Sequence, residues 1–286
     1  MKNNDWKERL NVVYSTNPDF KYESVEEDFV MLDDMVSNSI WMELNEAGYP
    51  CSVKNMENLI YSDFSFSYHP IREYMNHLPQ WDGIDHIGRL AESVHTIPAQ
   101  REFWLKGFRH FLVGMVAAAT QEEVVNHLCL LLCSKQNLGK TTFINKILSN
   151  DLRTDYLSTG IISAGNKDDL SRMAEFMLIN FDEFEGMTGH ELSLLKDLIT
   201  RKFISIRLPY ARHTLNLPHW ASFAGTCNYP QVLYDPTGNR RFLCYEIEKI
   251  DRYEIDYPQL YAQIKHLLDT GYRYWYEADE NNEKER

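Results

Sequence analysis

The sequence has no long apolar run and no local cysteine motif. No stretch approaches the roughly 18 apolar residues of a membrane span, and the first residues, MKNNDWKERL, lack the apolar core of a signal peptide. The five cysteines form no CxxC pair and have no histidine at zinc-finger spacing. These absences predict a cytoplasmic protein with no membrane partner, whose cysteines are buried free thiols in a reducing compartment.

Positive charge is also scarce. The 286 residues include 42 acidic and 29 basic side chains, which leaves a formal net charge of −13. Contact with nucleic acid would therefore depend on a local basic patch. One such patch lies between Lys196 and Arg241, where seven basic residues occur with only two acidic ones. The chain is long enough for one large domain or two modest ones.

Apolar spacing divides the chain into a helical first part and an alternating second part. Residues 25–48 and 99–121 have helical spacing, and the segment between them is broken by prolines and an Asp-Gly turn, so the first 120 residues are predicted to be all-helical. From residue 127, apolar runs at 127–133, 176–181 and 220–228 alternate with helical patterns at 140–149, 167–175 and 188–200.

This alternation predicts an α/β fold, with a mostly parallel sheet flanked by helices. Four segments are expected. They are a helical N-terminal region (1–95), a connecting helix (96–120), a core (121–250), and a C-terminal helix with a charged tail (251–286).

The stretch SKQNLGKTTF at 134–143 resembles a phosphate-binding loop without its first glycine. Of the pattern GxxxxGK(S/T) it keeps Gly139, Lys140 and Thr141, and Ser134 takes the place of the first glycine. A serine is compatible with the tight turn if its φ stays negative. The alternative is a loop that only looks like the motif.

A functional loop would hold ATP through backbone N–H groups at a helix N-terminus. Lys140 is expected to reach the β and γ phosphates, and Thr141 to ligate Mg²⁺. The residues predicted to contact the nucleotide are Ser134, Lys135, Gln136, Asn137, Leu138, Gly139, Lys140, Thr141 and Thr142.

Two later apolar runs end in polar residues. The run MLINF ends in Asp182 and Glu183. Asp182 is predicted to hold Mg²⁺ through water and Glu183 to polarise the attacking water, although a solvated strand end is the plain alternative. Asn228 ends the next run and would contact the γ phosphate and that water if its strand lies beside the one ending in Asp182.

Basic residues follow in two groups. Arg240 and Arg241 come after a turn sequence and could stabilise charge on a transferring phosphoryl group, or could serve only solubility. The segment KFISIRLPYARHTLNLP (202–218) alternates like a hairpin. It either contacts nucleic acid or packs on a neighbouring subunit. The residues predicted to bind DNA are Lys202, Arg207, Tyr210, Arg212 and His213.

Taken in order, these elements resemble the superfamily-3 helicase type of AAA+ ATPase, and more closely the virulence-associated E family, found in mobile-element primase-helicases. The resemblance rests on YHPIREYMNHLPQWDG (68–83), SKQNLGKTTF (134–143), INFDEFEGM (179–187), LKDLITRKFISIRLPYAR (195–212), FAGTCN (223–228) and DPTGNRRF (235–242).

The resemblance implies an AAA+ P-loop core, with Asp182 and Glu183 as the Walker B pair and Asn228 as the sensor. It also implies a homo-hexamer or similar ring, with the 202–217 hairpin facing single-stranded DNA in the central channel. Arg240 or Arg241 would be the finger that reaches a neighbour's site. No primase domain is visible ahead of residue 68, so priming is expected from a separate polypeptide.

The resulting hypothesis is a Mg²⁺-dependent ATPase that acts on DNA in the replication of a mobile element. The main alternative is a nucleotide-controlled DNA-binding or interference factor with little ATP turnover. A small-molecule kinase that shares the loop is a third hypothesis, and it leaves the basic hairpin unexplained.

Overall fold

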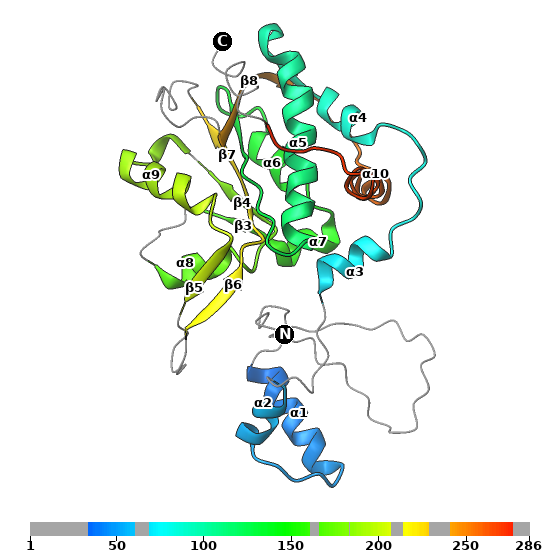
Figure 1. The fold of residues 1–286 in the computed structure, drawn as a ribbon, viewed down its shortest axis with the longest axis vertical. Coiled ribbons are helices and arrows are strands. Elements are labelled where there is room, and N and C mark those ends of the chain that lie inside the picture. Colours follow the sequence, from blue (N-terminus) through cyan, green and yellow to red (C-terminus); the bar gives the residue numbers. More distant parts are fainter. Residues whose placement is uncertain are drawn as a thin grey trace. The chain divides into compact units, whose positions relative to one another are not determined.

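The chain divides into two compact units, residues 1–73 and 74–286. A computed structural model describes residues 34–60, 69–160, 166–182, 184–206, 214–228 and 241–276 (Figure 1). The sequence predicts a boundary at residue 95, whereas the structure divides the chain earlier. Two elements ahead of residue 97, α4 (His86–Glu92) and β1 (Val94–Thr96), belong to the larger unit.

The smaller unit contains two helices, α1 (Asp34–Glu46) and α2 (Val53–Ile60). They pack through a small core of Ile40, Met56 and Ile60. The chain turns between them at Gly48, whose φ of +85° suits glycine. The helix predicted over 25–48 is confirmed from residue 34, and its earlier part lies outside the described residues. A third helix, α3 (Pro70–Asn76), spans the boundary between the units.

A six-stranded sheet forms the centre of the larger unit. Its strand order is β1-β8-β2-β7-β4-β3, and every pairing is parallel except that of β1 with β8. The strands after β1 are β2 (Cys129–Cys133), β3 (Leu157–Thr159), β4 (Leu178–Phe181), β7 (Ser222–Cys227) and β8 (Phe242–Ile250).

The mostly parallel α/β sheet is thus confirmed, and β2, β4 and β7 are the three strands predicted from apolar runs. Every residue of these three strands is buried, as expected for strands covered on both faces. The prediction that the first 120 residues are all-helical is wrong, because β1 adds a short edge strand by pairing with β8.

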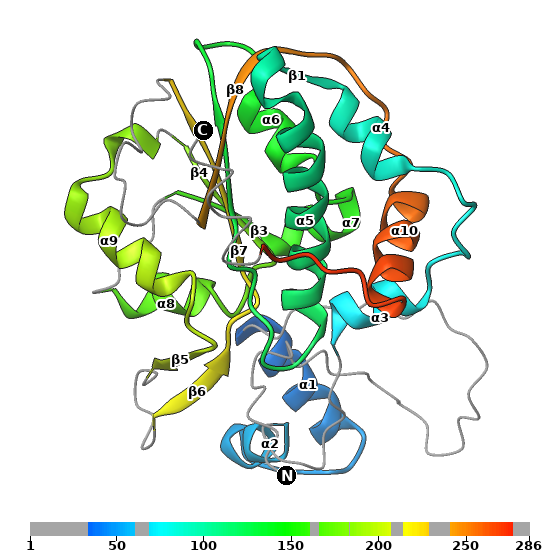
Figure 2. The ribbon, with the colours of Figure 1, turned by 45° about the horizontal axis from the view of Figure 1, so that its top comes forward.

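Helices cover both faces of the sheet (Figures 1 and 2). On one side lie α4, α5 (Arg101–Thr120), α6 (Lys140–Asn145) and α10 (Tyr257–Asp269). On the other side lie α8 (Lys167–Arg172) and α9 (Gly189–Leu198). The helix predicted over 140–149 ends early, because Ser149 accepts a hydrogen bond from the Leu152 N–H and caps a new helix, α7 (Asn150–Tyr156).

Aromatic side chains fix α5 against the sheet. Trp104 stacks on Phe108 with ring centroids 4.8 Å apart and meets Tyr245 of β8 edge-on at 5.0 Å. The Tyr245 hydroxyl donates to the Phe103 carbonyl at 3.1 Å. A Cβ on Gly107 would overlap the Tyr245 hydroxyl, so this close approach of helix and strand requires glycine.

The basic segment forms the predicted hairpin strands. Here β5 (Phe203–Ile206) pairs antiparallel with β6 (Leu215–Pro218), outside the main sheet and near α8 (Figures 1 and 2). Within β5, Ile204 and Ile206 are buried, whereas Phe203 and Ser205 are exposed. The bend at 207–213 lies outside the described residues.

The cysteine prediction is wrong in part. Cys133 and Cys227 form a disulfide across β2 and β7, and Cys51 and Cys244 are only partly buried. Local spacing could not predict this pair, since the two cysteines are 94 residues apart in sequence and meet only through strand pairing. Across the described ranges, no helix combines the length and apolar character that crossing a bilayer requires.

Candidate functional site

Three neighbouring strands end at one edge of the sheet, and each is followed by a residue of the predicted site. β7 pairs in parallel with both β2 and β4, so the carboxyl ends of the three strands lie side by side. Ser134 follows β2, Asp182 follows β4 and Asn228 follows β7. The adjacency required for an Asn228 role is therefore present.

The loop between β2 and α6 starts from an anchored backbone. The Ser134 N–H donates to the Cys227 carbonyl at 3.1 Å, which continues the β2–β7 ladder by one step. Gly139 precedes α6 with a φ of +79°, a conformation that favours glycine. Among the described residues only Glu123 and Asn137 combine a side chain with positive φ, so the turn at Ser134 does not need a glycine.

Lys140 lies within the curve of this loop. Its side chain is buried, and its Nζ donates to the Ser134 carbonyl at 2.7 Å, the Ser134 hydroxyl at 3.0 Å and the Lys135 carbonyl at 3.1 Å. Burial lowers the pKa of the Lys140 ammonium, and the Glu185 charge opposes that shift. The ammonium is therefore held by oxygen acceptors at the place where a phosphate-loop lysine is expected.

The two predicted Mg²⁺ ligands touch each other. The Thr141 hydroxyl donates to Asp182 Oδ1 at 2.9 Å, although the two residues are 41 positions apart. A second contact fixes α6 on the same strand, because Asn180 Nδ2 of β4 donates to Asn145 Oδ1 at 2.8 Å. The helix after the loop is thereby positioned against the strand that ends in Asp182.

Asn228 is bound by an acid that the sequence prediction did not include. Both its backbone N–H, at 3.2 Å, and its side-chain amide donate to Glu185 Oε1. Glu185 lies in η2 (Phe184–Gly186), a 3₁₀ turn directly after the Asp182 strand end. Its position three residues after Asp182 was the available signal. Glu183 lies outside the described residues.

A cavity of about 750 Å³ adjoins the loop. Gly139 and Thr142 line one side, together with Lys146 at the end of α6. The chain after β8, residues 250–255, lines the other side. This volume is within the range of small-molecule and cofactor pockets.

The structure does not bring Arg241 to this edge. Arg241 directly precedes β8, and Phe242 of β8 pairs with Cys129 at the start of β2. Arg241 therefore lies near the amino ends of the parallel strands, separated from the loop by the five residues of β2, about 16 Å of strand. Arg240 lies outside the described residues.

Of the predicted DNA-binding residues, only Lys202 is described. Its side chain is exposed and its Nζ lies 3.7 Å from a Glu123 carboxylate oxygen, an ion pair of little energetic weight at such exposure. Arg207, Tyr210, Arg212 and His213 fall in the bend of the hairpin, beyond the part of the chain that the structure describes.

The fold and this edge define a mixed α/β protein with a lysine-containing loop, an acidic strand end and an asparagine strand end grouped together. A family model described as the virulence-associated protein E-like domain matches residues 75–286, so the chain belongs to this family.

Solved structures of the apo C-terminal region of NrS-1 are among those that match this chain. Three of them have 14%, 15% and 14% sequence identity, with TM-scores of 0.45, 0.45 and 0.48. They cover 70%, 71% and 77% of this chain, which in turn spans about half of theirs (45%, 47% and 54%). No curated protein has a matching sequence.

Proposed function

We propose that the chain is a Mg²⁺-dependent ATPase that acts on DNA as a ring-shaped oligomer in the replication of a mobile element. The observation that carries the proposal is the contact between Thr141 and Asp182. A loop hydroxyl and a strand-end carboxylate are hard oxygen ligands, the type that Mg²⁺ prefers. Their contact beside a buried lysine matches what phosphoryl transfer from a nucleotide requires.

The residues present fit both the metal ion and the nucleotide. Thr141 and Asp182 would hold Mg²⁺, which neutralises charge on the phosphates when bound. Lys140 would leave its oxygen acceptors in the loop and donate to phosphate oxygens. The cavity beside Gly139 and Thr142 would take the base and sugar.

The two acids after Asp182 would have different roles. Glu183 would take a proton from the attacking water, as a general base. Glu185 would act as a positioning residue, because its carboxylate already holds both donors of Asn228. Asn228 would then be oriented toward the γ phosphate and the attacking water. Hydrolysis of ATP by water yields ADP, phosphate and a proton.

The position of Arg241 supports a ring. Arg241 lies at the opposite end of β2 from the loop of its own chain, so its guanidinium would serve a neighbouring chain's site more readily than its own. Arg240 or Arg241 would then act as a finger between subunits. The exposed Lys202 and the basic hairpin would contact single-stranded DNA, and membership of the virulence-associated protein E-like family supports the replication context.

The test is ATP hydrolysis by the purified chain, with and without single-stranded DNA, at low and physiological salt. Lys140→Ala should abolish turnover, whereas Lys265→Ala should leave it unchanged, because Lys265 is an exposed partner of Asp269 on α10. DNA should stimulate the wild type, and added salt should weaken that effect. An undiminished rate for Lys140→Ala would refute the assignment of the loop.

The ring has its own test. Chains carrying both Arg240→Ala and Arg241→Ala are mixed with Lys140→Ala chains, each inactive alone. Partial recovery of turnover is expected if the arginine acts on a neighbour's site, because mixed rings contain some sites with an intact loop and an intact arginine. No recovery at any mixing ratio would exclude an arginine that acts between chains.

One observation favours a second candidate, a nucleotide-controlled DNA-binding factor with little turnover. The Ser134 hydroxyl, which replaces the first glycine of the motif, accepts a hydrogen bond from Lys140 Nζ at 3.0 Å. This contact competes with phosphate for the lysine and would weaken nucleotide binding. ATP binding without DNA-stimulated turnover, at the level of Lys140→Ala, would favour this candidate.

A further inference from the structure

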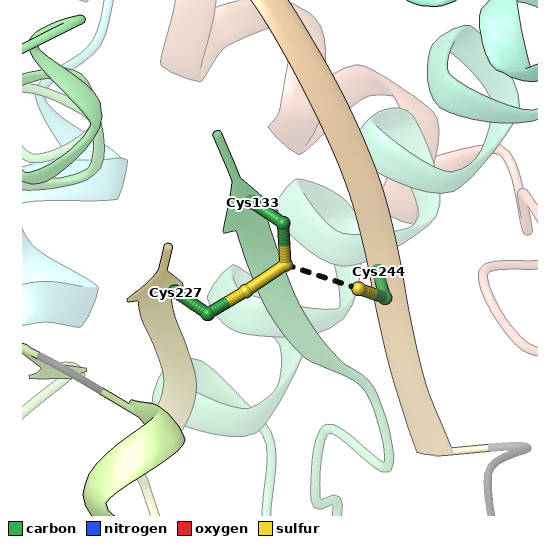
Figure 3. Close-up of side chains that lie close together, drawn as sticks. All are labelled: Cys133, Cys227 and Cys244. Carbon is green, nitrogen blue, oxygen red and sulfur yellow. Dashed lines mark hydrogen bonds between the residues drawn. A yellow bond between two sulfur atoms is a disulfide. The ribbon is translucent and has the colours of Figure 1, made fainter. Parts of the chain in front are cut away.

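Three cysteine side chains lie together at the strand ends that lead into the candidate site (Figure 3). Cys133 and Cys227 are direct partners in the β2–β7 register, with Cα atoms 4.6 Å apart, and are joined by a disulfide. On the other side of β2, the Cys244 Sγ of β8 lies 3.2 Å from the Cys133 Sγ. Cys133 therefore lies between two sulfur partners, in the strand order β7, β2, β8.

The three sulfurs differ in access. Cys133 and Cys227 are fully or almost fully buried, at 0% and 2% exposure, whereas Cys244 is partly exposed. A reagent in solution thus meets Cys244 first. Burial raises the pKa of the Cys244 thiol to about 11, with the Glu246 charge adding to the shift, so few molecules carry the reactive thiolate at neutral pH. Reaction at this position is therefore expected to be slow.

We propose that Cys133, Cys227 and Cys244 form a thiol–disulfide exchange site, through which a low-molecular-weight disulfide cross-links the strand that carries the loop to the strand that carries Asn228. The Cys244 thiolate attacks the small disulfide and releases one small thiolate. The Cys133 thiolate then attacks the Cys244 sulfur of this mixed disulfide and releases the second small thiolate.

The Cys227 thiolate finally attacks the Cys133 sulfur, which frees the Cys244 thiolate. In total, two protein thiols and one small disulfide become one protein disulfide and two small thiols. The oxidised chain retains Cys51, Cys129 and Cys244 as free thiols, which is the set that the structure contains.

The position of the disulfide gives it a consequence for the site. Cys133 directly precedes Ser134, whose oxygens hold Lys140, and Cys227 directly precedes Asn228, which Glu185 holds. The ladder contact from the Ser134 N–H to the Cys227 carbonyl already joins these two segments by one hydrogen bond. A covalent link beside that bond restricts any movement of the loop relative to the Asn228 segment. This step rests on the proposed function, because it concerns nucleotide binding.

The first experiment maps thiols and needs no activity. The full-length chain is reduced, exchanged into buffers of glutathione and glutathione disulfide, denatured with an alkylating reagent, and analysed by peptide mass spectrometry. The oxidised chain should lose alkylation at Cys133 and Cys227 and keep it at Cys244. Continued alkylation of both Cys133 and Cys227 at every ratio would overturn the proposal.

The second experiment tests the entry role of Cys244. Cys244→Ser should slow formation of the Cys133–Cys227 disulfide about fivefold or more, because the buried thiols must then react directly with the reagent. The matched control is Cys129→Ala, a buried cysteine of the same strand outside the cluster, which should react at the wild-type rate. Equal rates for Cys244→Ser and the control would refute the relay.

A thiophilic metal ion is the rival occupant, since the three sulfurs lie within 4.8 Å of one another. Reduced protein is therefore equilibrated with Zn²⁺, dialysed and analysed for metal. We expect no zinc that depends on Cys244. One zinc per chain that is lost in Cys244→Ser and that blocks oxidation would make the cluster a metal site and overturn the proposal.

The last measurement compares nucleotide binding by the oxidised and reduced chains in a fluorescence titration. Their dissociation constants should differ about fivefold or more, the usual size of coupling between two sites. Equal dissociation constants would show that the disulfide does not affect nucleotide binding. If neither form binds nucleotide, the proposed function fails, whereas the thiol map still decides whether the exchange site exists.

Discussion

Replacing Ser134 with glycine restores the usual first residue of the loop, and we expect tighter nucleotide binding from this change. In the wild type, Lys140 Nζ has three oxygen acceptors, two of which belong to Ser134. The backbone carbonyl remains in Ser134→Gly, so of the three Lys140 contacts only the one with the hydroxyl at 3.0 Å is lost. The bond that this hydroxyl donates to the Lys135 carbonyl, also at 3.0 Å, is lost with it. Lys140 then breaks one hydrogen bond fewer when it binds phosphate.

The size of the effect follows from that one hydrogen bond. A hydrogen bond to a charged group contributes about 1.5–3 kcal/mol, and the low end applies here because two acceptors remain. Since about 1.4 kcal/mol corresponds to a factor of ten in affinity, the dissociation constant should fall about tenfold. Glycine also adds freedom to the unfolded chain, so the free energy of unfolding should fall by about 0.5–1 kcal/mol beyond the loss of the hydrogen bond.

Ser134→Ala separates the two effects, because alanine removes the hydroxyl without adding backbone freedom. Both variants should bind a fluorescent ATP analogue more tightly than the wild type. Both should also lose the stability that the hydroxyl contacts contribute, and the glycine variant should lose about 0.5–1 kcal/mol more in denaturant unfolding. The control is Ser39→Ala in the smaller unit, where the serine hydroxyl also donates to a backbone oxygen. Weaker binding by both Ser134 variants would show that the hydroxyl helps to hold the nucleotide, and would refute the reasoning.

Three further predictions concern other parts of the larger unit. Gly139→Ala should lower the free energy of unfolding by about 1–2 kcal/mol, because a side chain is strained at a φ of +79° even though a Cβ would have open space. Gly189→Ala is the control and should be tolerated, because Gly189 has open space and no positive φ. Burial lowers the pKa of His219 from 6.5 to about 4. As the pH falls below 6.5, the wild type should therefore lose about 1.4 kcal/mol of unfolding free energy per pH unit beyond any loss seen in His219→Gln. Arg207→Ala with Arg212→Ala should lower the salt slope of single-stranded DNA binding by about 1.4.

Each of these predictions has a result that contradicts it. Equal unfolding free energies for the Gly139 and Gly189 variants would mean that the positive φ carries no cost. For His219, the direction of the pH effect follows from a folded pKa that lies below the unfolded one. The neutral imidazole therefore stabilises the protein above pH 6.5, and this stability is lost at lower pH because the unfolded chain takes up the proton. Parallel pH profiles for the wild type and His219→Gln would contradict it. An unchanged salt slope would show that Arg207 and Arg212 do not contact DNA phosphates.

Elements with a strong local signal could be predicted from the sequence. The buried runs that became β2, β4 and β7, the helix after Gly139 and the alternating strands of the hairpin all follow from periodicity within one segment. β1 could not be predicted, because a three-residue strand has too few residues for a period and exists only through its pairing with β8.

Contacts between distant segments were harder to predict from the sequence. The sequence could propose that Asn228 acts with Asp182, but strand order decides whether their strands are neighbours. It could not pair Cys133 with Cys227, since register across two strands depends on the whole sheet. Glu185 was missed for a related reason, because two acids nearer the strand end already filled the expected roles and its bond to Asn228 is a tertiary contact.

The parallel sheet explains why these contacts gather at one edge. β2, β4 and β7 run parallel, so their carboxyl ends point in the same direction and the residues that follow them meet at one edge. The same geometry sends Arg241, which precedes its strand, to the opposite edge. Under the proposed function, an arginine at the start of β8 would therefore reach the loop of a neighbouring copy more readily than that of its own. If the chain is the proposed ATPase, this division between strand ends and strand starts is the physical reason to expect that its turnover depends on assembly.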